Sequence, residues 1–198
     1  DFRLVLDRNA GTLSSWEHDG ARLLKCGPRL NVWRAPTDND EGQPWSEQSA
    51  AAWRRAGLDR VVHRVRSVTV QQPSPAIAEI QVCSVVSADD VEVGIDAEYH
   101  YTICGRGDIL LETRVTASPG LPPLPRLGLQ LVLPGGYERF TWYGRGPHES
   151  YPDRKESAAI GVYSGTVDEQ YVPYVRPQEN GNKTDVRWVA LTDRAGTG

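Results

Sequence analysis

The segment VEVGIDAEYHYTI, residues 91–103, decides the fold class of this chain. Apolar or aromatic side chains stand at every second position, and polar residues or Gly fill the positions between them. Because successive side chains of a β-strand point to opposite faces, this period of two predicts a strand with one buried face. That face would carry Val91, Val93, Ile95, Ala97, Tyr99, Tyr101 and Ile103.

The same alternation continues on both sides of this segment. It covers residues 61–70, 78–85, 109–117 and 127–133. A further strand is predicted at 2–6, and 188–196 reads as a strand that runs into a turn. Turn-forming residues separate the runs, at 9–11, 72–75, 88–90, 105–108 and 134–136. Strands at near-regular spacing predict an all-β, antiparallel sandwich, which we take as a single domain over 1–198.

Two segments interrupt the strand pattern. Residues 46–56 predict one short helix, with Ser46 as its cap, Glu47 in its first turn, Trp53 docking it and Gly57 ending it. Residues 118–126 are rich in Pro and predict a stiff crossover between two sheets, with a polyproline ligand as the alternative.

The bulk properties narrow the classes of function. The net charge of −4 argues against a nucleic-acid partner, because phosphate binding needs a basic stripe. No run reaches 18 apolar residues, so no membrane span is expected. Three widely spaced cysteines fit neither a disulfide framework nor a zinc site, and they predict buried free thiols in a reducing cytoplasm. The chain lacks Met and opens within a strand pattern, so we expect a fragment of a larger protein.

Three segments dense in polar and aromatic residues are the places for chemistry. In the first, Pro36 forces an extended conformation on its neighbour, and Asp38, Asn39 and Asp40 follow in a tight loop. The spacing fails that of a calcium loop, which leaves a self-satisfied loop or the edge of a substrate site.

The second segment, 142–154, places His148 beside Glu149. This pair suits general acid–base chemistry, but an ion-paired or hydrogen-bonded structural role for Glu149, Asp153 and Arg154 is the stronger interpretation. The third segment, 171–182, combines two Tyr rings, an Arg and several amides, which suits either a sugar site or a well-satisfied sandwich edge.

The three segments together resemble one known family. The strings RAPTDND (34–40), WYGRGPHESYPDR (142–154) and YVPYVRPQENGN (171–182) are similar, in order and separation, to the C-terminal β-sandwich module of the large lactose-cleaving β-galactosidases. That group is glycoside hydrolase family 2, and the module is its small-chain or domain 5 type. Ser150 departs from the Asn that is usual after His-Glu.

The resemblance implies an antiparallel supersandwich of the galactose-mutarotase-like type, truncated at the C-terminus. It implies a retaining β-galactosidase that hydrolyses terminal β-D-galactosides such as lactose, with its two catalytic carboxylates on a TIM barrel outside this chain. We therefore expect no catalytic residue in residues 1–198, and an isolated fragment that is inactive. The loop 33–40 would edge the active site through Arg34, Asp38, Asn39 and Asp40.

The resemblance also bears on other residues and on partners. A secondary sugar contact, or a contact with the barrel, would involve His148, Glu149, Tyr151, Arg154, Tyr174, Glu179 and Asn180. No metal or cofactor is expected in this chain, whereas full-length members commonly use Mg and Na ions bound elsewhere. The expected partners are the remaining domains of the same chain, including the barrel, the β-galactoside substrate and further copies in a cytoplasmic homo-oligomer.

Two alternatives stay open. One is a stand-alone carbohydrate-binding or aldose-1-epimerase-like module, in which His148 and Glu149 would open the sugar ring. The other is a purely structural or oligomer-forming sandwich.

Overall fold

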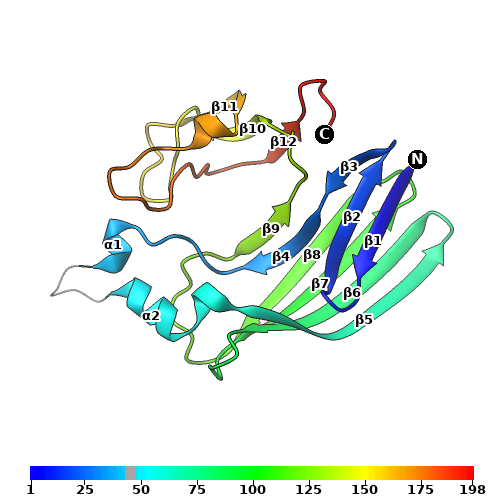
Figure 1. Cartoon of the computed structure of the whole chain (residues 1–198), viewed down its shortest axis with the longest axis horizontal. Helices are drawn as coiled ribbons and strands as arrows, with labels where there is room; N and C mark the ends of the chain where they lie inside the picture. Colours follow the sequence, from blue (N-terminus) through cyan, green and yellow to red (C-terminus); the bar gives the residue numbers. More distant parts are fainter. Residues whose placement is uncertain (43–47) are drawn as a thin grey trace. The chain divides into compact units, whose positions relative to one another are not determined.

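The computed structural model describes residues 1–42 and 48–198 (Figure 1). These residues form two compact units. The first comprises Asp1–Arg34 and Asn39–Leu133, and the second comprises Ala35–Asp38 and Pro134–Gly198. The sheets are antiparallel, as the alternation predicted. Whether 1–198 folds as a single domain stays a prediction.

The first unit contains two sheets, which makes it a β-sandwich. One sheet has the order β1-β2-β4-β9, with β3 paired to β2. Its strands are β1 (Phe2–Asp7), β2 (Thr12–His18), β3 (Ala21–Leu24), β4 (Cys26–Asn31) and β9 (Gly128–Val132). The other sheet has the order β5-β6-β7-β8 and consists of β5 (Val62–Ser74), β6 (Ile77–Ser87), β7 (Ile95–Cys104) and β8 (Ile109–Ala117).

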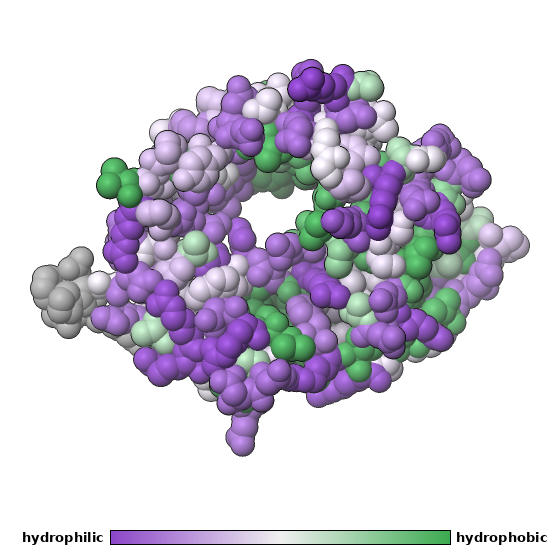
Figure 2. Space-filling view, in the orientation of Figure 1, coloured by the Kyte–Doolittle hydropathy of each residue, from purple (hydrophilic) through white to green (hydrophobic). Residues whose placement is uncertain are grey.

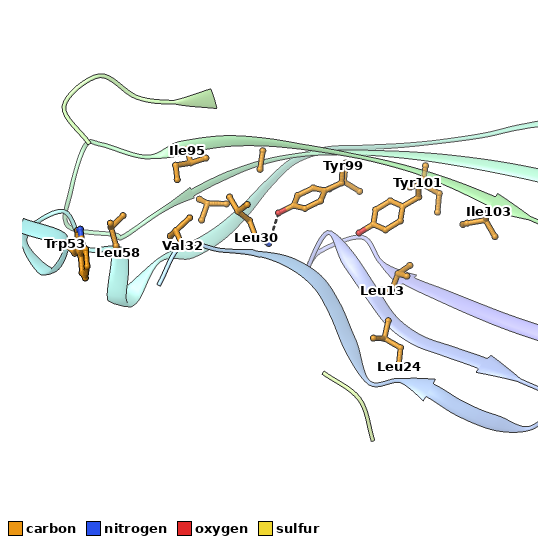
Figure 3. Close-up of a cluster of buried hydrophobic side chains, with 14 of the residues drawn as sticks. Leu13, Leu24, Leu30, Val32, Trp53, Leu58, Ile95, Tyr99, Tyr101 and Ile103 are labelled. Carbon is orange, nitrogen blue, oxygen red and sulfur yellow. Dashed lines mark hydrogen bonds between the residues drawn. The ribbon is translucent and has the colours of Figure 1, made fainter. Parts of the chain in front are cut away.

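The core of this sandwich is built by the alternation that the sequence shows. Tyr99, Tyr101 and Ile103 point from β7 toward Leu13, Leu24 and Leu30 of the facing sheet (Figure 3). The backbone N–H of Leu30 donates a hydrogen bond of 3.1 Å to the Tyr99 hydroxyl, which joins the two layers. Each large apolar side chain buried in this way contributes roughly 1.5–3 kcal/mol.

Strand β7 begins later than the sequence predicted, at Ile95 rather than Val91. A Cβ on Gly94 would lie 2.9 Å from the Cβ of Ser87, so the backbone passes close to β6 at this point. The carbonyl of Gly94 accepts a hydrogen bond from the N–H of Ser118 at 2.9 Å. Residues 91–94 therefore belong to the turn that precedes the strand.

The Pro-rich segment is a crossover, as predicted. It leaves β8 in the four-stranded sheet and enters β9 in the five-stranded one. Leu121 and Leu124 pack against the core on the way, and the carbonyl of Pro123 accepts a hydrogen bond from Trp53 Nε1 at 2.9 Å.

The predicted helix is present as α2 (Ser49–Arg55). Trp53 docks it, with 5% of its surface exposed and its ring edge-on to Trp33. Gly57 ends it in the left-handed conformation, at φ 71°, and η1 (Leu58–Arg60) follows. The expected roles of Ser46 and Glu47 lie outside the described residues.

The second unit is organised around a three-stranded sheet. β10 (Arg139–Gly146) lies between β11 (Ala159–Thr166) and β12 (Trp188–Thr192), and η2 (Asp168–Gln170) follows β11. Trp142 is 2% exposed and stacks on Phe140 at 5.0 Å between ring centroids. On the opposite face, Tyr143 pairs with Val162 and Trp188, and these two partners are exposed.

Not all apolar side chains are buried in this fold. Figure 2 shows green hydrophobic residues exposed among purple ones over the strands of the first unit, in the lower right of the view. Within the described part of the chain, no helix is long and apolar enough to cross a membrane.

Candidate functional site

The loop of residues 34–40 is anchored in the first unit by Arg34. Its guanidinium donates two hydrogen bonds to Asp40, with 2.6 Å from Nη1 to Oδ2 and 3.0 Å from Nη2 to Oδ1. Arg34 also donates from Nε to the carbonyl of Pro125 at 3.2 Å, and it lies 5.3 Å from the ring centroid of Trp53. A bidentate pair of this kind fixes the orientation as well as the position of the side chain.

Asp38, at the start of the short helix α1 (Asp38–Glu41), makes a different kind of contact. Within the second unit its Oδ1 lies 3.3 Å from Arg176 Nη1, and its N–H donates to Gln178 Oε1 at 3.4 Å. Both charged side chains are more than half exposed, so the pair is worth roughly 0.2–1 kcal/mol. Asn39 is exposed. Of the predicted loop residues, Arg34 and Asp40 thus bond each other within the first unit, and Asp38 contacts Arg176 and Gln178 within the second.

A second group of polar residues surrounds Glu149, whose surface is only 8% exposed. Its Oε1 accepts hydrogen bonds from Arg154 Nη2 and from the Tyr174 hydroxyl. Its Oε2 accepts a hydrogen bond from the N–H of Gly181 at 2.8 Å. Burial acts to raise the pKa of Glu149, but the hydrogen bonds from Tyr174, Gly181 and Arg154 hold it below its ordinary value.

Gly181 reaches this carboxylate because it lacks a side chain. Its φ of +76° favours Gly, and a Cβ at this position would lie 2.6 Å from the carbonyl oxygen of Gln170. Residues 171–182 therefore supply two of the three hydrogen-bond donors to Glu149, from Tyr174 and Gly181.

The segments around Ser150 and Asn182 are joined by partly buried hydrogen bonds. Asn182 Nδ2 donates to the carbonyl of Ser150, and the N–H of Ser150 donates to the carbonyl of Asn182, both at 2.8 Å. The hydroxyl of Ser150, which is fully buried, bonds that of Thr184 at 2.8 Å. Sequence reasoning gave Lys183 and Thr184 no role in this site, because both lie just beyond the string 171–182.

The other residues of the predicted contact set have mixed roles. Asn180 accepts from the N–H of Val172 and donates to the carbonyl of Gln178, both at 3.0 Å, so it shapes its own loop. Tyr151 lies under Arg154, and burial followed by the charges of Glu149 and Glu179 raises its pKa. The structure thus brings Glu149, Tyr151, Arg154 and Tyr174 together, and uses Asn180 as a support.

His148 is not paired with the Glu149 carboxylate. Its Nδ1 lies 2.7 Å from the carbonyl oxygen of Glu149, and its Nε2 lies 3.3 Å from that of Ser157. Acid–base opening of a sugar ring needs one group that gives a proton and one that takes it. Because the Glu149 carboxylate is ionised and already accepts three hydrogen bonds, the geometry speaks against an epimerase-like pair.

A pocket of about 480 Å³ opens beside this cluster, entirely within the second unit. Its walls are Pro147, His148, Glu149, Arg154, Ser157, Glu169, Gln170, Val172, Tyr174 and Lys183. Lys183 lies 5.0 Å from the centroid of the Trp142 ring, and burial lowers the pKa of its ammonium group, while the charge of Glu149 acts to raise it.

Over residues 1–42 and 48–198, no group of three or more His, Cys, Asp or Glu side chains could hold a metal ion. Cys26, Cys83 and Cys104 are free thiols, and each is half-buried rather than fully buried.

Comparisons with known proteins all match this chain to beta-galactosidases. A family model described as "Beta galactosidase small chain" matches residues 1–197. The chain is 38% identical over its full length to a beta-galactosidase of Priestia megaterium, and 37% identical over 87% of its length to one of an Arthrobacter species. A beta-galactosidase of Vibrio cholerae is 36% identical over 91% of the chain. The chain spans only 18% of the length of each of these relatives.

Proposed function

The chain belongs to the beta-galactosidase small-chain family, and on this premise we propose that it is a non-catalytic module of a longer, retaining β-galactosidase. In that role it supports hydrolysis of terminal β-D-galactosides such as lactose, while a barrel elsewhere in the polypeptide supplies the two reacting carboxylates. Two observations together carry the proposal. The family model matches residues 1–197, and the chain spans less than a fifth of the length of each relative.

The loop of residues 34–40 is the contribution that we propose this module makes to the active-site edge. Two features support it. Arg34 is held by Asp40, Pro125 and Trp53, which gives the loop a fixed base. The contact of Asp38 with Arg176 is exposed and weak, so the tip can exchange partners at little cost.

The test uses the full-length protein and a nitrophenyl β-D-galactoside. Arg34→Ala removes the base of the loop, and we expect kcat/KM to fall by about 10-fold or more, since small displacements of positioning groups have effects of this size. Arg66→Ala is the matched control, because Arg66 pairs with Asp96 in an exposed ion pair on the first unit's other sheet. Thermal melting of both variants shows that they fold.

Two results would change this view. An Arg34→Ala variant with unaltered kinetics would favour the purely structural reading of the module. Turnover of the galactoside by residues 1–198 alone would contradict the non-catalytic role. Cytoplasmic location, homo-oligomeric assembly and Mg and Na ions bound elsewhere in the protein remain predictions.

A further inference from the structure

The pocket beside Glu149 contains more polar groups than the cluster itself uses. Glu149, Arg154 and Tyr174 bond one another. Over residues 1–42 and 48–198, the ammonium of Lys183 and the hydroxyl of Ser157 make no hydrogen bond or ion pair. Glu169 uses one carboxylate oxygen to accept the N–H of Thr166 at 2.7 Å, and Gln170 donates its amide to the carbonyl of Thr166 at 3.0 Å.

The charges on the pocket walls favour a neutral ligand. Arg154 and Lys183 contribute two positive charges, and Glu149 and Glu169 contribute two negative ones. A phosphate or carboxylate that approached Lys183 would also approach Glu149, whose charge already acts on that ammonium. The balance therefore works against anions and against simple cations.

The remaining features suit a polyhydroxy ring. The walls offer both hydrogen-bond donors and acceptors, on Lys183, Ser157, Gln170 and Glu169. Pro147 and Val172 add apolar wall between them. The volume of about 480 Å³ lies in the range of roughly 300–1,000 Å³ that small-molecule sites occupy.

We propose that this pocket is a second carbohydrate-binding site, which takes one pyranose unit of a galactoside. Lys183 donates to a ring hydroxyl, and Glu169 and Gln170 accept from others. The choice of galactose among the pyranoses rests on the proposed function, whereas the pocket's preference for a neutral polyol rests on its own walls.

The experiment measures binding with the reaction centre occupied. The full-length protein is first inactivated with a 2-deoxy-2-fluoro-galactosyl reagent, which traps the covalent intermediate of a retaining enzyme. Methyl 1-thio-β-D-galactoside, which resists hydrolysis, is then titrated and followed by saturation-transfer NMR. We expect saturable binding with a Kd on the order of 1 mM, the strength of a site that makes a few hydrogen bonds.

Two variants assign that binding to the pocket. Lys183→Met keeps the aliphatic stem on Trp142 and removes the ammonium, and we expect the Kd to rise by about 10-fold, the effect of losing one hydrogen bond to a charged donor. Val172→Phe fills the pocket without changing a charge and gives the same loss, so it decides the matter if Lys183→Met does not fold. Lys25→Met, at an exposed site on the first unit, is the matched control and retains binding.

Several outcomes would overturn the site. These are the absence of saturable binding in the blocked protein, equal binding by Val172→Phe, or competition by inorganic phosphate, which would indicate an anion site. If the reagent fails to label the protein and no galactoside is hydrolysed, the proposed function fails by itself. In that case the titration is made on the unmodified protein, and binding that Val172→Phe removes still supports the pocket.

Discussion

Glu149 is the residue whose surroundings most depend on its charge. Its carboxylate is buried and accepts from Arg154, Tyr174 and the N–H of Gly181. We expect Glu149→Gln to lower the free energy of unfolding by about 2 kcal/mol at pH 7, because hydrogen bonds to a charged group contribute roughly 1.5–3 kcal/mol. Urea denaturation measures this loss, and Asp153→Asn in the neighbouring exposed turn serves as control.

The same carboxylate gives stability a defined pH dependence. Its folded-state pKa lies below the ordinary value, so the unfolded chain binds its proton more readily. The stabilisation is therefore complete above the unfolded pKa of about 4.3 and is lost as the pH falls through the lower, folded pKa. Denaturation between pH 7 and pH 3 should show a smaller decline for Glu149→Gln than for the wild type; parallel curves would contradict this.

His63 should make stability depend on pH in a higher range than Glu149 does. Burial, followed by the charge of Arg29, lowers the pKa of this imidazole. Since the unfolded chain takes up the proton first, stability is complete above about pH 6.5 and declines as the pH falls toward the folded pKa. We expect His63→Gln to flatten the stability curve below about pH 6.5 in the same urea measurement.

At the scale of elements, the bond between Tyr99 and Leu30 links the two sheets of the first unit. Tyr99→Phe would leave the buried N–H of Leu30 without an acceptor, at a cost of roughly 1–3 kcal/mol. Tyr101→Phe is the matched control on the same strand, since within the described structure its buried hydroxyl has no hydrogen bond of normal geometry. Equal losses from the two variants would show that Leu30 finds another partner.

Tyr101 adds a check at alkaline pH. Burial, with a smaller effect of Tyr99, raises its pKa to about 12. The unfolded side chain ionises near pH 10, so stability should decline from about pH 10 upward. Tyr101→Phe should remove part of that decline in an alkaline denaturation series.

The elements that the sequence predicted well are those with strict alternation, such as β6 and β8, because period-two burial is a local property. The crossover at 118–126 was also predictable from local sequence, because its Pro residues cannot lie in the interior of a sheet. The short strands β2 and β4 were not predicted, because Thr12–His18 and Cys26–Asn31 lack a regular apolar period. The pairing of β4 also depends on Leu129 and Gln130 of β9, which are distant in the sequence.

The candidate site was predictable only in part. The sequence indicated a structural, ion-paired or hydrogen-bonded role for Glu149 and Arg154, but not which partners they would have. The sequence did not identify Gly181 as the third donor, and it did not identify the ammonium of Lys183. Both lie more than thirty positions from Glu149, and local sequence patterns do not show which distant residues the fold brings together.

At the scale of the whole molecule, the two units differ in their cores. The contiguous cluster of buried apolar residues lies entirely in the first unit, whereas Trp142 and Ala158 are the fully buried apolar residues of the second over its described length. Regions with few buried contacts open at lower free energy. We expect hydrogen exchange in the 198-residue chain to be slower by about 10-fold or more in β6 and β7 than in β10 and β11. Uniform protection would instead show one cooperative unit.

The crossover of residues 118–126 has a consequence that reaches beyond its own position. Its carbonyls at Pro123 and Pro125 hold Trp53 and Arg34, two side chains that belong to distant parts of the chain. Inserting or deleting a single residue there would shift both acceptors by about 3 Å along an extended backbone, with no change to any charged group. The length of this segment therefore matters as much as the identity of a polar residue would. We expect natural variants of residues 118–126 to exchange residues without changing the length of the segment.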